Sequence, residues 1–252
     1  VERALENLEV QFLANRGPNL KFIVLSDFTD APTETCPGDA EIVAAAQAGV
    51  RELEARYGDG QQTTFYLLHR NRQWNPAQGV WMGWERKRGK LTQFNEVVLG
   101  ADRSAFPVTV GDLGQLRTLR FVITLDADTL LPPDTAPTLI GALAHPLNRA
   151  VYDPVRERVV RGYAILQPRV GVSLPSANRT LFASIVSGEP GVDPYTTAVS
   201  DVYQDLYDEG SFAGKGIYDV AAFERATRGR FPDNALLSHD LIEGGFARAG
   251  LV

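Results

Sequence analysis

One stretch of the sequence, residues 121–129 (FVITLDADT), constrains the fold more than any other. Its β-branched and aromatic residues predict a buried strand, and Asp126 and Asp128 follow at the carboxyl end of that strand. Alternate side chains of an extended backbone lie on the same face, so we expect both carboxylates on one side and Ala127 on the other. Two such carboxylates can hold Mg²⁺ or Mn²⁺ if water and a substrate diphosphate supply the remaining oxygen ligands. Aspartates are also common in turns and helix caps, so the triplet alone leaves the metal site and a plain turn equally open.

The order of the apolar segments favours the metal site. Strand patterns and helix patterns alternate along the chain, which predicts an α/β fold: a Rossmann-like, mostly parallel sheet flanked by helices on both faces. Such sheets bind ligands at the carboxyl ends of their strands, and the two aspartates fall at that edge. We expect strands at 21–25, 63–69, 121–125 and 163–170, helices at 5–13, 39–57, 132–143, 200–207 and 240–248, and irregular chain at 95–114.

A loop is expected at 71–89, where Trp74, Trp81 and Trp84 surround a basic run. Tryptophans can stack on a sugar or a base, but long loops more often use them as buried anchors, and we expect burial here. The basic run can also be an ordinary solvated surface. Lys90 is its best candidate for a phosphate ligand, because it follows a glycine at the expected start of a helix.

Three further residues at segment ends are candidates for the same site. Asp27 follows the first strand, where it can contact the base or ribose of a nucleotide or simply form a turn. Lys215 lies in the glycine-rich stretch 210–218, which permits close approach of a ligand but lacks the spacing of a phosphate-binding P-loop. Asp240 opens the last helix, either as a first-turn acid or as a general base.

Composition limits the class of protein. With 252 residues the chain can form one large α/β domain or two small ones. The net charge of −6 argues against nucleic-acid binding, for which a basic face is expected. Cys36 is the only cysteine, which excludes an intrachain disulfide and a thiolate zinc cluster, and the three histidines are too scattered to predict a histidine metal site. No apolar run reaches the roughly 20 residues that span a bilayer.

Several motifs in a fixed order carry a resemblance to a known family. They are SDFTD at 26–30, GK at 89–90, LDADT at 125–129, QPRV at 167–170, FAGKGIYDVAAF at 212–223 and SHDLIEGGFARAG at 238–250. Their order resembles that of the inverting, processive GT-A glycosyltransferases, which include cellulose and hyaluronan synthases. More narrowly, the chain from about Lys21 onward is similar to the glycosyltransferase domain of bacterial cyclic β-1,2-glucan synthases, on the segments at 74–91, 143–148 and 193–220.

The resemblance implies a metal-assisted inverting glucosyltransferase with UDP-glucose as donor and a growing β-1,2-glucan as acceptor. Asp126 and Asp128 match the DxD motif for Mg²⁺ or Mn²⁺ and diphosphate, with Asp128 the firmer metal ligand and Asp126 able to contact ribose or reach the metal through water. Asp27 matches the nucleoside-binding strand end, and Lys90 or Lys215 would hold the diphosphate. Asp240 matches the catalytic base.

Two departures from the family pattern limit what can be carried over. His239 stands where the related synthases have the glutamate of a Glu-Asp pair, which leaves its role open. The Gln-x-x-Arg-Trp motif of the processive relatives is absent from these 252 residues, so processivity is not implied.

The resemblance also bears on the protein around the chain. The sequence starts within a helical pattern and ends like a helix entering a strand, so we expect a single GT-A domain over 1–252, excised from a larger membrane protein and incomplete at both ends. Flanking transmembrane segments, further catalytic domains and a place at the cytoplasmic face of the bacterial inner membrane are implied. Two alternatives stay open: a nucleotide-sugar-binding module that is inactive without the missing segments, and a metal-dependent nucleotidyltransferase.

Overall fold

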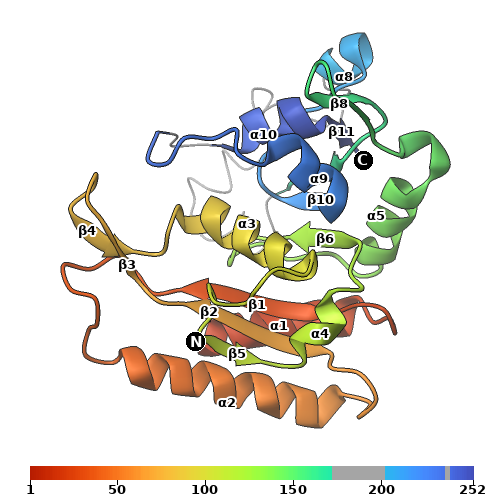
Figure 1. The fold of residues 1–252 in the computed structure, drawn as a ribbon. Helices are drawn as coiled ribbons and strands as arrows, with labels where there is room; N and C mark the ends of the chain where they lie inside the picture. The colour runs from red at the N-terminus through yellow and green to blue at the C-terminus, as the bar shows by residue number, and fades with distance from the viewer. Residues whose placement is uncertain (172–201, 236–238) are drawn as a thin grey trace, which may run out of the picture. The chain divides into compact units, whose positions relative to one another are not determined.

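The computed structural model describes residues 1–171, 202–235 and 239–252, which form two compact units (Figure 1). The first unit contains Val1–Arg120, Asp126–Pro137 and Gly229–Leu237, and the second contains Phe121–Leu125, Thr138–Arg228 and Ser238–Val252. Each unit is described by itself. Within the described residues, no helix is both long enough and apolar enough to cross a membrane.

The first unit is built on a three-stranded sheet of order β1-β2-β5. Strand β1 (Phe22–Asp27) pairs in parallel with β2 (Phe65–Arg70), in a register that sets Asp27 opposite Arg70. Strand β5 (Val108–Val110) pairs with β2 in the antiparallel sense. All six residues of β2 are buried, as expected for a central strand, whereas β1 is only partly buried.

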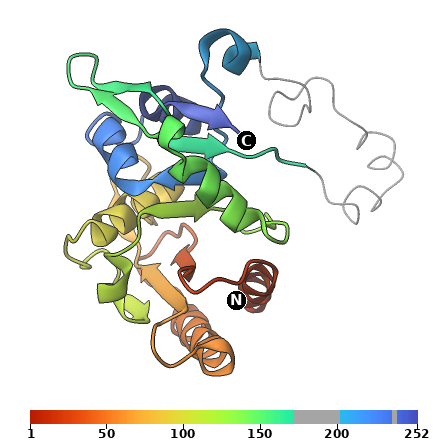
Figure 2. The same cartoon turned by 90° about the vertical axis from the view of Figure 1, so that its right-hand side faces the viewer.

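Two amphipathic helices, α1 (Glu2–Ala14) and α2 (Asp39–Tyr57), complete the core of this unit. Figure 2 views both helices nearly end-on, so their axes are roughly aligned. Val50 and Leu53 of α2 pack with Phe65 and Leu67 of β2. The partly buried residues packed against this cluster include Leu5, Leu8, Phe12, Phe22, Val24, Ala46 and Tyr57. The predicted helix at 39–57 is confirmed at both ends, because its apolar stripe repeats at helical spacing.

The segment predicted as a loop at 71–89 contains regular structure. Strands β3 (Gln73–Asn75) and β4 (Val80–Met82) form a hairpin, and helix α3 (Arg86–Val98) follows. Trp74 faces Trp81 across the hairpin with ring centroids 5.9 Å apart, and the residue is 50% exposed. The predicted burial is therefore wrong for Trp74, because pairing across a two-stranded hairpin covers only one side of the ring.

The segment predicted as irregular at 95–114 also contains regular structure. It holds the end of α3, strand β5 and the short helix α4 (Leu113–Leu116). Strand β5 is three residues long and pairs with β2, with Val110 opposite Leu67. Three residues are too few to show a periodic strand pattern, so the sequence did not predict this strand.

The second unit contains a four-stranded sheet of order β11-β9-β10-β6. Its strands are β6 (Phe121–Thr124), β9 (Ile165–Gln167), β10 (Gly216–Asp219) and β11 (Ala249–Leu251). Strand β10 is antiparallel to both β6 and β9, and β11 is parallel to β9. The start of β10 therefore lies beside the end of β6, with Gly216 opposite Thr124.

Helices and a second hairpin lie between the strands of this sheet in the sequence. The remaining elements are α5 (Thr135–Ala144), which begins among the residues of the first unit, the 3₁₀ turn η1 (Pro146–Asn148), the hairpin of β7 (Val151–Asp153) and β8 (Arg158–Arg161), and the helices α8 (Val202–Tyr207), α9 (Val220–Thr227) and α10 (Asp240–Ala247). The first two residues of the helix predicted at 200–207 lie outside the described residues.

The predicted α/β class is confirmed, but the prediction of a mostly parallel sheet is wrong for the described residues. Only β1 with β2 and β9 with β11 pair in parallel there, and the other described pairs are antiparallel. An apolar strand buried by its neighbours has the same sequence pattern in either direction, so direction depends on connections that local pattern does not reveal.

Candidate functional site

Asp126 and Asp128 lie just beyond β6, which ends at Thr124. Residues 126–129 form a turn, closed by a hydrogen bond from the Thr129 amide to the Asp126 carbonyl at 3.0 Å. The alternation of side chains in a strand therefore does not extend to the two carboxylates. The Asp128 side chain is exposed, and its Oδ1 lies 3.4 Å from the Thr129 hydroxyl, which donates to it.

The Asp126 carboxylate is already paired with a cation of the protein. The ammonium nitrogen of Lys87, in the first turn of α3, lies 2.5 Å from Asp126 Oδ1, and both side chains are about one-third exposed (34% and 35%). Because solvent reaches this pair, a diphosphate or a divalent cation can still approach it. Two carboxylates in one turn supply the oxygen donors that Mg²⁺ and Mn²⁺ prefer, so these residues fit the predicted ion.

Lys87 is a residue that the sequence interpretation missed. The sequence favoured Lys90 instead, because Gly89 was predicted to lie at the start of a helix. That prediction is wrong: α3 starts at Arg86, so Lys90 is in its second turn, and its position cannot be used as a phosphate-binding helix N-terminus. Gly89 is required for another reason, since a Cβ there would collide with the carbonyl oxygen of Trp84.

Asp27 and Lys90, predicted as separate ligands of the nucleoside and the diphosphate, form an ion pair with each other. Asp27 Oδ1 accepts a hydrogen bond from Arg70 Nε at 2.6 Å, and Lys90 Nζ lies 3.1 Å from Asp27 Oδ2. Arg70 is buried, with 3% of its side chain exposed, and Asp27 and Lys90 are partly buried, with exposures of 13% and 20%. Arg70 also donates to Gln93 Oε1 at 2.6 Å. Both oxygens of Asp27 are therefore engaged in an ionic network that joins β1, β2 and α3.

A buried histidine lies next to this network. His69 is one residue before Arg70 on β2, and its Nδ1 is 3.0 Å from the Ser26 hydroxyl. Burial lowers the pKa of His69, so the neutral imidazole is favoured in the folded protein. Its Nε2 is buried without a hydrogen-bond partner. Phe28 closes one side of the ring at 4.2 Å between centroids, in an edge-on arrangement.

In the second unit, Asp240 is the first residue of α10 and its carboxylate lies against the glycine-rich stretch. A Cβ on Gly214 would lie 2.7 Å from Asp240 Oδ1 and 2.8 Å from Oδ2. Gly214 has a φ of +74°, a conformation that other residues rarely adopt. Glycine is therefore needed at 214 both for the backbone and for the close approach of Asp240.

The glycine-rich stretch is itself fixed within this unit. The buried Gln167 accepts a hydrogen bond from the Ala213 amide at 2.9 Å, and the Thr124 hydroxyl donates to the Gly214 carbonyl at 3.3 Å. Lys215 is partly buried and immediately precedes β10. Lys215 and Asp240 thus belong to one local arrangement, formed by the segment before β10 and the start of α10.

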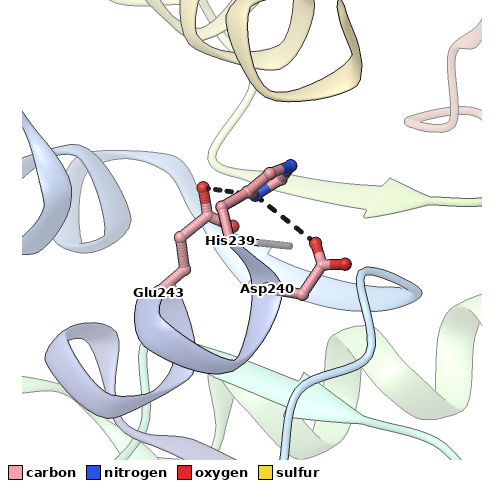
Figure 3. A group of neighbouring side chains, drawn as sticks. All are labelled: His239, Asp240 and Glu243. Atoms are coloured by element: carbon pink, nitrogen blue, oxygen red, sulfur yellow. Dashed lines mark ion pairs between the residues drawn. The ribbon is translucent and has the colours of Figure 1, made fainter. Parts of the chain in front are cut away.

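Asp240 has two further ionisable neighbours, shown in Figure 3. His239 Nδ1 lies 3.0 Å from Glu243 Oε1 and 3.5 Å from Asp240 Oδ1. Neither contact has the geometry of a hydrogen bond, since Nδ1 is buried without a hydrogen-bond partner. The sequence interpretation missed Glu243, although a residue four positions from His239 on a helix was the available signal.

The chain is thus an α/β protein in which acidic side chains gather at a strand end and at a helix N-terminus. No family model matches it. Over 253 aligned positions, which cover the whole chain, it is 45% identical to the cyclic beta-(1,2)-glucan synthase NdvB of Rhizobium meliloti (strain 1021). The chain spans 9% of the length of that synthase. The resemblance read from the sequence motifs is confirmed, and the chain corresponds over its whole length to a segment of a cyclic β-1,2-glucan synthase.

Proposed function

We propose that the chain is the glycosyltransferase domain of a cyclic β-1,2-glucan synthase, a single domain of GT-A type. It transfers glucose from UDP-glucose to a growing β-1,2-glucan with inversion at the anomeric carbon. The observation that carries this proposal is the identity of 45% to such a synthase along the entire chain. We further propose that the parent protein carries transmembrane segments and other catalytic domains, and holds this domain at the cytoplasmic face of the inner membrane.

The residues proposed to bind the donor belong to the first unit. Asp126 and Asp128 would hold Mg²⁺ or Mn²⁺, which when bound neutralises charge on the diphosphate leaving group. Lys87, whose ammonium pairs with Asp126, supplies a second positive charge for the diphosphate. Asp27 would contact the nucleoside only if its network with Arg70 and Lys90 rearranges, because both of its carboxylate oxygens are engaged.

Asp240 is the proposed general base. Its carboxylate would accept the proton of an acceptor hydroxyl as the new bond forms between that oxygen and the anomeric carbon, while the bond from carbon to the diphosphate oxygen breaks and UDP leaves. The support is its place against Gly214, beside Lys215, in a position that a larger residue would obstruct. A base needs to lie within about 3 Å of the hydroxyl, so this fixed position favours catalysis.

Product analysis separates this function from its alternatives. With UDP-glucose and a β-1,2-glucan acceptor, the intact synthase is expected to release UDP, whereas release of pyrophosphate would support a nucleotidyltransferase. Calorimetric titration of the chain with UDP and Mn²⁺, beside the same transfer assay, tests the third possibility. Binding without transfer by the chain, together with transfer by the intact synthase, would identify a module that needs its missing neighbours.

A further inference from the structure

The start of α10 carries three potential metal ligands that the proposed reaction does not use together. They are the imidazole of His239, which precedes the helix, and the carboxylates of Asp240 and Glu243. One ligand atom from each residue lies within 4.8 Å of the others. Figure 3 shows the imidazole between the two carboxylates at the start of α10.

The two distances from the imidazole nitrogen are close to those expected for donors around one cation. Ligands held at about 2.1 Å from a shared metal lie roughly 3.0–3.4 Å apart, each pointing at the metal rather than at the other ligands. His239 Nδ1 lies 3.0 Å and 3.5 Å from the two carboxylate oxygens. It forms no hydrogen bond at either distance, so the nitrogen is not directed at either oxygen.

Burial of this acidic pair favours a cation at this place. The Glu243 side chain is only 8% exposed, and its one ion pair within the described part of the chain is with His239. The neighbouring Asp240 carboxylate is 24% exposed. A positive charge shared by the two side chains would offset the cost of burying the Glu243 carboxylate beside the Asp240 carboxylate. The positive end of the α10 dipole contributes about half an elementary charge, less than two carboxylates require.

We propose that His239, Asp240 and Glu243 form a second divalent-cation site, made of different residues from the Asp126 and Asp128 site. A mixed set of one imidazole and two carboxylates suits a transition metal such as Mn²⁺ better than Mg²⁺. The cation would use Oδ1 of Asp240, which faces His239, and leave Oδ2 available to accept a proton. Cation binding here does not depend on glucosyl transfer.

Pulsed electron paramagnetic resonance of bound Mn²⁺ tests the proposal directly. A coordinated imidazole couples its ¹⁴N nucleus to the metal, which carboxylate ligands cannot do. The metal-stripped protein reloaded with Mn²⁺ is expected to show this coupling, and Asp128→Ala should retain it. His239→Ala should lose it. Glu243→Gln should weaken Mn²⁺ binding about tenfold or more, because even loss of a group supporting a ligand costs about 10–100-fold.

His145→Ala is the matched control, since it removes an exposed imidazole of the same unit and should leave the coupling unchanged. Circular dichroism checks that each variant is folded, and His239→Asn replaces the alanine variant if that protein unfolds. Absence of ¹⁴N coupling in the folded wild type would overturn the proposal. Coupling that survives removal of His239 would overturn it equally. Failure of UDP-glucose transfer would not change this readout.

Discussion

Gly214→Ala tests the packing of Asp240 against the glycine-rich stretch. The new Cβ would lie 2.7 Å from Asp240 Oδ1 and 2.8 Å from Oδ2. Contacts between carbon and its neighbours are favourable from about 3.5 Å, so the carboxylate must retreat by roughly 0.7 Å. A displacement of about 1 Å at a reacting group can cost on the order of 10²-fold in rate. We therefore expect UDP-glucose transfer to fall by about two orders of magnitude.

The substitution also strains the backbone, and a control separates the two effects. Gly229 has a φ of +70°, close to the +74° of Gly214, but a Cβ there would meet no atom within 4 Å. Both alanine variants should lose about 1–2 kcal/mol of stability from the left-handed conformation, measured by urea unfolding. Only Gly214→Ala should lose transfer. Equal activity of the two folded variants would refute the argument that Asp240 needs this position.

Three further predictions concern the first unit. Asp27→Asn leaves Arg70, which is 3% exposed, without its anionic partner. The free energy of unfolding, measured in urea, should fall by about 3–5 kcal/mol. A fall below about 1 kcal/mol would show that the network does not stabilise the fold. Burial lowers the pKa of His69, so stability should fall as pH drops below about 6.5, where the unfolded chain binds the proton more readily. His69→Gln should flatten this part of the melting temperature profile, and an unchanged profile would exclude His69 as its source. Asp128→Ala should abolish the Mn²⁺ dependence of UDP binding in calorimetry, whereas retained dependence would remove Asp128 from the metal site.

The fold could be predicted where one element's own pattern decides its structure. Helix α2 is an example, because its inward positions repeat at helical spacing over 19 residues. Strand direction was not predictable in this way. Strand β6 was read as part of a parallel sheet, but its described partner is β10, which runs antiparallel to it. The apolar run of β6 is compatible with either neighbour.

In the candidate site too, a residue could be predicted only where its own segment identifies it. Asp240 was found from its place at a helix start, and α10 does begin there. Lys87 could not be distinguished from its basic neighbours, because its pairing with Asp126 joins residues 39 positions apart. Asp27 was read as a ligand-binding residue from its place at a strand end. Its network depends on Arg70 and Lys90 arriving from two other elements.

The measurement that tests the account most directly is glucosyl transfer by Asp240→Asn in the intact synthase. The amide has nearly the shape of the carboxylate but cannot accept the proton of the acceptor hydroxyl. With UDP-glucose and a β-1,2-glucan acceptor, we predict that UDP binding persists while transfer is abolished. Transfer at the wild-type rate by a folded Asp240→Asn protein would contradict the assignment of Asp240 as the base.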